Sequence, residues 1–443
     1  MGNHVHDHHR TQRPLRTPPG EDPPDHARPI RAPSAGTPRR APELVPALGI
    51  LRRSARPIPL RPTRTKQTKE TEALKIARIE TFQVQWMPGE KPAQRAAFVR
   101  VHTDDGLVGI GEASPMQGGL ASLGIIAHDI ALHLIGADPL DHAVLQDRLL
   151  HRLVKLGPEG ALSGALAAID IALWDLKGKK LGLPIYKLLG GAWRTALPFY
   201  ASIGHNGAER SIDEVCRVVE QRLKDGPAAI KIRFDNDRTT PDLDIKGDIA
   251  KARAVRKLVG EDFPLAFDAN NGFSVGGAIR VGRALEELGF WWFEEPVQHY
   301  HVRQMGEVAR ALDITVSAGE QTYTTAGVAD LISAGIRMVQ PDIVKMGGIT
   351  GLMRCAALCQ AHGVELVPHQ TQPTIGHMAN LHVCAAHSHA TKPCELDDPS
   401  SRRHVVFVNP PKPVGGLFHL PDAPGLGLEL IEEEIARRRI DPA

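Results

Sequence analysis

Three acidic residues that follow apolar, strand-like runs could together bind a metal ion. Asp268, Glu294 and Glu320 lie 26 residues apart, and each closes a short run that is typical of a buried strand. Carboxylate oxygens with no Cys or His among them suit a hard divalent cation, and Mg²⁺ would complete its octahedron with water or substrate oxygens. One such acid alone would more often cap a helix or pair with a lysine, whereas three at equal spacing favour a shared Mg²⁺ site.

Two cations lie together on another strand-like run. Lys231 and Arg233 are two residues apart, and the strand period of two places them on the same face. Buried cations need anionic partners, and the three acids together with a substrate carboxylate would supply them. The alternative is a structural ion pair at the rim of the sheet.

An acid and an imidazole close the next two runs along the chain. Asp342 and His369 would come within hydrogen-bonding reach if their strands are neighbours, and the carboxylate would then orient the ring and raise its basicity. A general base needs this arrangement. Glu395 closes the last run, where a protonated carboxyl with a burial-raised pKa could donate to a developing oxyanion. A hydrogen-bonded rim acid is the alternative for Glu395.

Together these residues suit one reaction, the removal of a proton α to a carboxylate. That step adds negative charge to a group that is already an anion, so it needs a cation on one side and hydrogen-bond donors on the other. Mg²⁺, Lys231 and Glu395 would supply that field, and His369 would take the proton.

The elements that must position these residues form a repeat from residue 197 onward. Apolar runs alternate with amphipathic helical patterns, and Gly closes many of the helices. Eight strand–helix units predict an α/β fold, a (β/α)8-type barrel (a modified TIM barrel) over residues 194–404, with its site at the C-terminal strand ends. The runs cover residues 197–203, 228–234, 264–271, 290–296, 314–320, 337–343, 364–370 and 392–398, with helical patterns at 211–225, 248–259, 274–288, 324–334, 348–362 and 374–388.

Residues 74–193 have a different pattern and predict an α+β capping domain, to which the tail 405–443 returns. Strand-like runs at 75–87, 95–103 and 107–113 precede three helical stretches, and an Asp-Asp-Gly turn at 104–106 indicates a hairpin. Residues 1–73 contain 13 prolines and many arginines and histidines, so we expect a disordered tail.

Charge and cysteine content exclude several classes of function. The first 73 residues carry 14 Lys/Arg against 7 Asp/Glu, which leaves 39 against 44, a net charge of −5, for residues 74–443. That mildly acidic body gives no electrostatic basis for binding nucleic acid. Five cysteines without a CxxC pair indicate a reducing cytoplasm, and no apolar run approaches the length of a membrane span.

These motifs resemble the mandelate racemase/muconate lactonizing group of the enolase superfamily over residues 74–443. The resemblance rests on KIR (231–233), DANNG (268–272), FEEP (293–296), GE (319–320), PDIVKMGGITG (341–351), PHQ (368–370), CEL (394–396) and the segment 164–191. It implies a capping domain that closes over the barrel, a homo-oligomer (a dimer or an octamer), and Asp268, Glu294 and Glu320 as Mg²⁺ ligands. It also implies that Asp342 and His369 are the acid/base pair of the mandelate-racemase branch.

One departure from that family's pattern decides between reactions. Racemases of this branch carry Lys-x-Lys on the second strand, whereas this chain has Arg233 in the second position, and a guanidinium is a poor base near neutral pH. A single His can instead abstract the α-proton and protonate a departing β-hydroxyl. We therefore expect a dehydratase that converts an acid sugar (an aldonate or aldarate) to a 2-keto-3-deoxy acid in carbohydrate catabolism.

Two alternatives stay open. One is a racemase, epimerase or sugar-lactone cycloisomerase of the same branch, and the other is a metal-binding relative without turnover. The substrate is a small carboxylate in the catalytic cases. Candidate substrate contacts are Asn270, His205 and Gln321, with further specificity expected from loops at 85–94 and 299–301.

Overall fold

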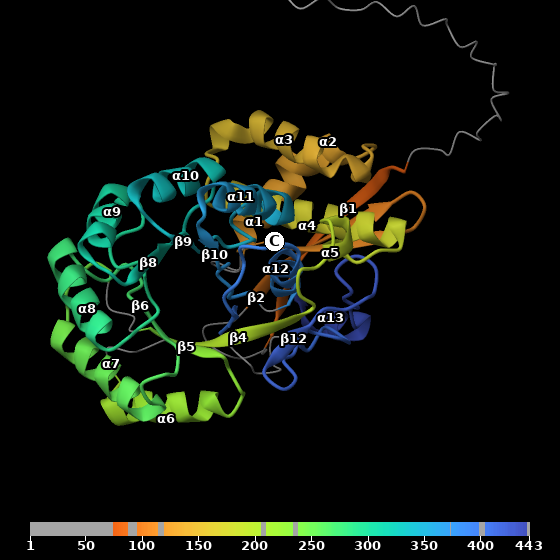
Figure 1. Ribbon diagram of the computed structural model, residues 1–443. Helices are drawn as coiled ribbons and strands as arrows, with labels where there is room; N and C mark the ends of the chain where they lie inside the picture. Colours follow the sequence, from red (N-terminus) through yellow and green to blue (C-terminus); the bar gives the residue numbers. More distant parts are fainter. Residues whose placement is uncertain are drawn as a thin grey trace, which may run out of the picture. The chain divides into compact units, whose positions relative to one another are not determined.

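A computed structural model of the chain describes residues 74–86, 95–113, 119–204, 210–233, 238–372, 374–397 and 404–440. Contacts divide the chain into Met1–Lys69 and Glu70–Ala443, and all described residues lie in the second unit. The expected disorder of residues 1–73 concerns residues outside the described part. The two halves of the second unit, a capping domain and an open barrel, are shown in Figure 1.

The capping domain begins with an antiparallel sheet of β1 (Ile76–Gln85), β2 (Arg95–Thr103) and β3 (Val108–Ala113). The predicted hairpin is confirmed, because β2 pairs with β3 across the turn at Gly106, whose φ of 89° suits glycine. At the other edge, β13 (Arg439–Ile440) pairs with β1. The C-terminal tail therefore returns to the capping domain, as predicted.

Helices cover one face of this sheet, and the longest of them, α4 (Ala161–Leu181), packs directly on β3. The packing is close, because a Cβ added at Gly109 or Gly111 would overlap the carbonyl oxygens of Ala172 or Ala168 in α4. The remaining helical segments are α1 (Leu120–Ile125), a π-helical turn (Ile126–Ile130), α2 (Ala131–Leu134) and α3 (His142–Leu153), with short 3-10 turns at Pro139–Asp141 and Val154–Leu156.

Eight parallel strands then form the barrel, in the order β11-β4-β5-β6-β7-β8-β9-β10. They are β4 (Ala196–Ile203), β5 (Ala229–Arg233), β6 (Leu265–Asp268), β7 (Trp292–Glu294), β8 (Thr315–Ala318), β9 (Met338–Val339), β10 (Glu365–Leu366) and β11 (Cys394–Leu396). The predicted α/β barrel with a capping domain is confirmed in an open form. In the described part of the chain, the ladder does not continue from β10 to β11.

Within the described ranges, seven helices connect the eight strands, one fewer than eight complete units would have. They are α6 (Ile212–Leu223), α7 (Ile245–Val259), α8 (Val275–Glu287), α9 (Val302–Ala311), α10 (Thr325–Ala334), α11 (Gly348–His362) and α12 (Ile375–Ala386), and Figure 1 shows α6 to α10 along the outer side of the strands. A short helix α5 (Ile185–Leu188) precedes β4. After β11, the next described helix is α13 (Glu432–Arg438), which packs against β1 of the capping domain.

The tail also contributes to the barrel, which differs from the predicted domain boundary. Strand β12 (Leu417–His419) pairs antiparallel with β4, so residues of the 405–443 segment belong to both domains. The physical reason is that β4 has a free edge near its start, where Pro198 faces Leu417 in the ladder.

A set of polar contacts joins the capping domain to the segment that follows β9. Asp170 Oδ2 accepts from the backbone N–H of Thr350 at 2.8 Å, and Trp174 Nε1 donates to Thr350 Oγ1 at 2.9 Å. Gln146 Nε2 donates to the Gly347 carbonyl at 2.7 Å, and the Ser163 hydroxyl donates to the Lys345 carbonyl. We call these the cap–barrel contacts.

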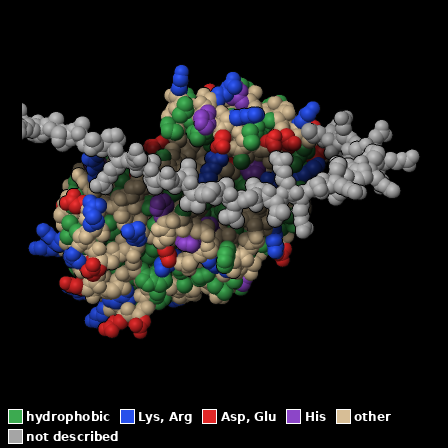
Figure 2. Space-filling model, turned by 45° about the horizontal axis from the view of Figure 1, so that its top comes forward, with side chains coloured by type: hydrophobic (Ala, Val, Ile, Leu, Met, Phe, Trp, Pro, Cys, Tyr) green, Lys and Arg blue, Asp and Glu red, His purple; other side chains and the backbone are tan. Residues whose placement is uncertain are grey.

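The exposed surface carries both signs of charge. Figure 2 shows Lys/Arg and Asp/Glu side chains interspersed over the visible face of the described part, without a stripe of one sign there. Within the described ranges, no single helix is both long and apolar enough to cross a membrane, and the pair Leu120–Leu134 and Pro139–Leu156 meets that test only together, across a 120° bend.

Candidate active site

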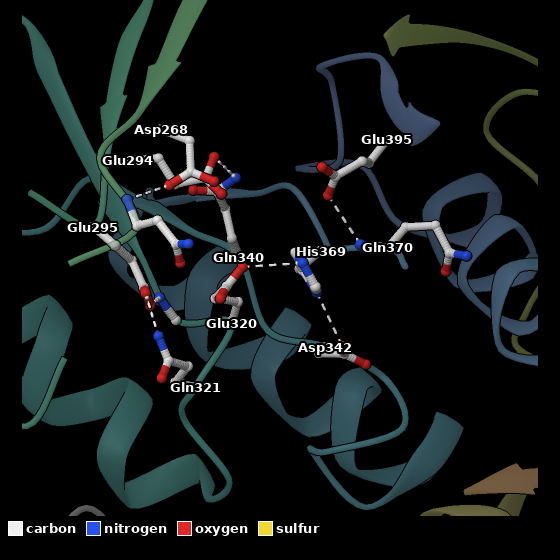
Figure 3. A network of polar contacts seen from close by, with 12 residues as sticks. Asp268, Glu294, Glu295, Glu320, Gln321, Gln340, Asp342, His369, Gln370 and Glu395 are labelled. Carbon is white, nitrogen blue, oxygen red and sulfur yellow. Dashed lines mark hydrogen bonds and ion pairs between the residues drawn. The ribbon is translucent and has the colours of Figure 1, made fainter. Parts of the chain in front are cut away.

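The predicted site residues lie at the C-terminal ends of neighbouring barrel strands. Arg233 on β5 is the register partner of Asp268 on β6, and Asp268 is in turn the partner of Glu294 on β7. These three residues therefore lie at one level of the barrel mouth. Figure 3 shows Glu320, Asp342, His369 and Glu395 completing a ring around that mouth.

Lys231 lies between carboxylates of this ring and is 1% exposed. Its Nζ lies 2.7 Å from Glu294 Oε1, 2.9 Å from Glu395 Oε1 and 3.9 Å from Asp268 Oδ2. Burial disfavours the ammonium form, but the Glu294 and Glu395 carboxylates outweigh it and raise the pKa of Lys231 well above its ordinary value. Lys231 is therefore a fixed positive charge and not a proton acceptor.

The predicted contact between Asp342 and His369 is confirmed. His369 Nδ1 lies 2.9 Å from Asp342 Oδ2, and the two residues form a parallel bridge beyond the ends of β9 and β10. Gln372 Nε2 donates to both oxygens of Asp342, at 3.0 and 2.8 Å, which fixes the carboxylate plane. The imidazole of His369 is thus held through Nδ1, so Nε2 faces the barrel mouth.

That second nitrogen contacts one of the predicted metal ligands. His369 Nε2 lies 3.0 Å from Glu320 Oε2, and Figure 3 shows the ring between Glu320 and Asp342. Burial lowers the pKa of His369, but the two carboxylates outweigh that effect and raise it well above its usual range. In this arrangement both ring nitrogens of His369 face carboxylate oxygens.

The donor set fits a divalent cation. Burial and the neighbouring Glu294 charge raise the pKa of Asp268 well above its ordinary value, which indicates negative charge without enough compensation. Three buried carboxylates of this kind suit Mg²⁺. Glu294 and Glu320 are paired here with Lys231 and His369, however, and no three metal-ligating side chains of the described residues are arranged to hold an ion. The ligand set Asp268, Glu294 and Glu320 therefore stays a prediction.

The direction of the Glu395 pKa shift is opposite to the one that a neutral, proton-donating carboxyl would need. Burial raises the pKa of Glu395, but Lys231, His369 and the backbone N–H of Gln370 together lower it below its ordinary value. Glu395 Oε1 faces Lys231, and Oε2 accepts from the Gln370 N–H at 2.9 Å. Glu395 thus contacts Lys231 and joins β11 to the segment after β10.

The sequence reading missed a buried network next to the ring. Glu295 is 1% exposed, accepts from Gln321 Nε2 at 2.7 Å and contacts the amide of Asn271. Burial, with the nearby Glu320, raises the pKa of Glu295 to about 7. The signal in the sequence was the second acid of FEEP, which follows the end of β7 and has a φ of 38°. Lys345 was missed too, and its Nζ donates to the Glu320 carbonyl at 3.0 Å.

The three candidate substrate contacts differ in their surroundings. Asn270 has a φ of 46° and contacts Arg238, and its backbone N–H donates to Asp268 Oδ1 at 2.8 Å. Gln321 is bound to Glu295 and Asn271, so its amide supports the ring. His205 lies outside the described residues, as do positions 87–94 of the predicted capping loop.

Comparisons with known proteins agree with this architecture. Residues 77–190 match the family model for the mandelate racemase/muconate lactonizing enzyme N-terminal domain, and residues 214–434 match the enolase C-terminal domain-like model. A crystal structure of a mandelate racemase/muconate lactonizing protein from Paracoccus denitrificans, complexed with magnesium, is similar with a TM-score of 0.81 and 64% identity. That likeness covers 83% of this chain and 99% of the other.

Functionally named relatives are more distant. The chain is 32% identical over 358 residues to D-galactarolactone cycloisomerase of Agrobacterium fabrum, covering 78% of this chain and 92% of the relative. It is also 32% identical over 303 residues to L-talarate/galactarate dehydratase of Salmonella typhimurium, covering 67% and 72%. The similar proteins thus include an isomerase and a lyase.

Proposed function

This chain belongs to the mandelate racemase/muconate lactonizing enzyme family of the enolase superfamily, and on that premise we propose that it dehydrates an acid sugar to a 2-keto-3-deoxy acid. The family acts on small carboxylates, and the relatives that are 30–32% identical to this chain include dehydratases and a cycloisomerase. The proposed substrate is an aldonate or an aldarate, and the proposed cofactor is Mg²⁺.

The buried ring supports a division of roles. Lys231 Nζ binds the substrate carboxylate, and Glu395 and Glu294 keep that ammonium charged and in place. Mg²⁺, held by Asp268, Glu294 and Glu320, would act as a Lewis acid that stabilises the charge developing on the carboxylate. His369 Nε2 accepts the α-proton, with Asp342 orienting the ring through Nδ1. His369 then returns that proton to the departing β-hydroxyl, so that water leaves.

The single observation that carries the proposal is one oriented imidazole in a site whose second cation on β5 is an arginine. Arg233 lies level with Asp268 in the ladder, at the position where a two-base racemase of this branch carries lysine. A guanidinium keeps its proton, so it cannot act as the second base. One base that removes a proton and then protonates a leaving group is sufficient for elimination.

A lactone cycloisomerase is the second candidate. It is favoured by the similarity to D-galactarolactone cycloisomerase, and one imidazole can also move a proton within a lactone. A metal-binding protein without turnover is less well supported, because Asp342 and Gln372 hold the imidazole in a defined orientation that a passive site does not need.

We further propose a cytoplasmic homo-oligomer. All five cysteines lie in the described residues and carry free thiols, which suits a reducing compartment. The homo-oligomer rests on the family resemblance.

The test is incubation with a panel of acid sugars and their lactones in deuterated water with Mg²⁺. We expect keto-acid formation with loss of water. Deuterium incorporation or lactone isomerisation without dehydration would select the second candidate, and inactivity on the whole panel would contradict the enzyme proposal. His369→Asn should lower kcat at least about a hundredfold, because positioned acid–base groups contribute roughly that much. His362→Asn, an exposed histidine on α11, is the matched control and should keep full activity.

A further inference from the structure

A cavity of about 170 Å³ opens next to the ring, between the C-terminal ends of β11, β4 and β5 and the helix α6. Its lining includes three arginines, and two of its lining residues, Arg233 and Glu395, also belong to the ring. The lining residues used below are Arg210, Arg222, Arg233, Gly204, Glu395 and Asp397. We call this the arginine-lined cavity.

The cavity is continuous with the site around Lys231. Glu395 lines it and also places Oε1 2.9 Å from Lys231 Nζ, and Arg233 follows Lys231 by two residues on β5. The three predicted metal ligands belong to β6, β7 and the segment after β8, on the other side of β5 in the strand order. A substrate whose reacting carboxylate lies at Lys231 can therefore extend away from the metal ligands into this cavity.

The positions of two arginines are determined by their surroundings. A Cβ added at Gly204 would come within 2.7 Å of Arg233 Nε, so the guanidinium lies directly against the end of β4. Arg222 on α6 donates to the Asp397 carbonyl at 2.6 Å and to the Leu396 carbonyl at 3.1 Å. These contacts hold positive charge at the side and base of the cavity.

The third arginine, Arg210, is half-buried before α6 and completes a lining with three guanidinium groups against two carboxylates. One of those carboxylates, Glu395, is already bonded to Lys231 and to the Gln370 N–H. Arg222 Nε also pairs with Asp225 Oδ2 at 3.2 Å, so the positive charge that the lining presents to a ligand comes from Arg210 and Arg233. Guanidinium groups present forked N–H donors that match the two oxygens of a carboxylate.

We propose that the arginine-lined cavity binds a second, distal carboxylate of the substrate. The enzyme then acts on aldarates or their lactones, in which both ends of the sugar chain are acidic, in preference to aldonates, whose far end is a neutral hydroxymethyl. This inference rests on the proposed function only for the placement of the reacting carboxylate at Lys231. It holds for either a dehydratase or a lactone cycloisomerase.

The test compares matched pairs of six-carbon aldarates and aldonates of the same configuration, with Mg²⁺ present. We expect wild type to prefer the aldarate by kcat/KM. Arg210→Gln should lower kcat/KM for the aldarate about tenfold to a hundredfold, mainly by raising KM, because a charge-assisted hydrogen bond is lost while the reacting end is unchanged. The aldonate should change by no more than roughly twofold, since its far end makes no ionic contact. Arg217→Gln, an exposed arginine on α6, the helix that follows Arg210, is the control and should change neither.

Equal use of both members of a pair by wild type, or an equal loss for both in Arg210→Gln, would overturn the inference while leaving the proposed function in place. If no acid sugar is converted, the proposed function fails. Binding of the aldarate is then the remaining test of the proposed carboxylate site. In that case, a rise in melting temperature with the aldarate that is absent in Arg210→Gln supports the cavity as a carboxylate site. No rise in wild type contradicts it.

Discussion

At the scale of single residues, the site is a cluster of buried carboxylates that share a few buried cations. Five fully or nearly buried carboxylates lie there, with Lys231 and Lys345 buried beside them and Arg233 on the same strand as Lys231. Burial and the neighbouring Glu294 raise the pKa of Asp268 well above its ordinary value, as expected where buried acids lie close together. The five carboxylates are Asp268, Glu294, Glu320, Asp342 and Glu395.

A second buried carboxylate outside the ring gives a pH prediction. Burial raises the pKa of Asp170 in α4 to about 7, against roughly 3.9 in an unfolded chain. Between these values the folded protein holds a proton that the unfolded chain has lost, so this residue's contribution to stability falls as pH rises and levels off above about 7. Asp170→Asn should remove that dependence.

The measurement is urea unfolding of wild type and Asp170→Asn at pH 5 and pH 7.5. The variant should gain on the order of 2–3 kcal/mol relative to wild type between the two pH values, since one pKa unit corresponds to about 1.4 kcal/mol. Asp129→Asn, which removes a carboxylate from the neighbouring π-helical turn, should show no such gain. A difference between Asp170→Asn and wild type that does not change with pH would contradict the prediction.

The residue scale also shows what a sequence can and cannot predict. The Asp342–His369 contact could be predicted because the two residues end consecutive strand-like runs. It required only that the two strands are neighbours in the sheet. The lowered pKa of Glu395 could not be predicted. Burial alone would raise this pKa, and only the positions of Lys231, His369 and the Gln370 N–H make the net shift a lowering. Where electrostatic contributions of similar size oppose one another, the sign of the net pKa shift depends on the distances between the groups. Spacing along the chain does not give those distances.

At the scale of elements, the close contact between β3 and α4 determines the shape of the capping domain. A side chain at Gly111 would overlap the Ala168 carbonyl, so the helix could not approach the sheet. Gly111→Ala should lower the free energy of unfolding by about 1–3 kcal/mol or more, because backbone must move to relieve the overlap. Gly124→Ala in α1 is the control, since nothing lies within 4 Å of the new methyl group.

Thermal and urea unfolding of both glycine variants check this expectation. Gly124→Ala should be neutral or more stable by up to about 1 kcal/mol, because alanine is the better helix former. Equal stability of Gly111→Ala and wild type would show that α4 can move away from β3 without loss of packing.

The strands and helices could be predicted where the hydrophobic period is clear. Prediction failed where a segment of the tail pairs with a distant part of the chain. The eight strand positions followed from short apolar runs that end in polar residues. The course of the tail after β11 did not, because its described residues form strand β12 and helix α13, whose partners β4 and β1 lie far away in the chain. Pairing of β12 with β4 depends on an edge that only the assembled barrel presents.

At the scale of the whole molecule, the described residues form three hydrophobic clusters. The core of the capping domain and the core of the barrel use side chains between Ile76 and Ile435 in the described ranges. Deletion of residues 1–70 should therefore leave kcat/KM and melting temperature nearly unchanged. A loss of more than about tenfold in activity, or a clear fall in melting temperature, would show that the removed segment contributes to the folded unit.

The architecture of the whole chain was more predictable than its details. Alternating strands and helices and a separate α+β region specify a barrel with a cap, because few other arrangements bury such elements. The open edge between β10 and β11 was not foreseen, because hydrogen bonding around a barrel depends on shear and curvature that a linear pattern does not contain.

The cap–barrel contacts restrict how this scaffold can be redesigned. Gln146, Ser163 and Asp170 hold the backbone that follows Asp342, so the module expected to choose the substrate also anchors the strand end that orients the imidazole. Grafting a foreign cap for new selectivity would disturb proton transfer unless these three side chains were transplanted with it. Loop exchange within the existing cap is the safer engineering route, because it leaves the helices α3 and α4 in place.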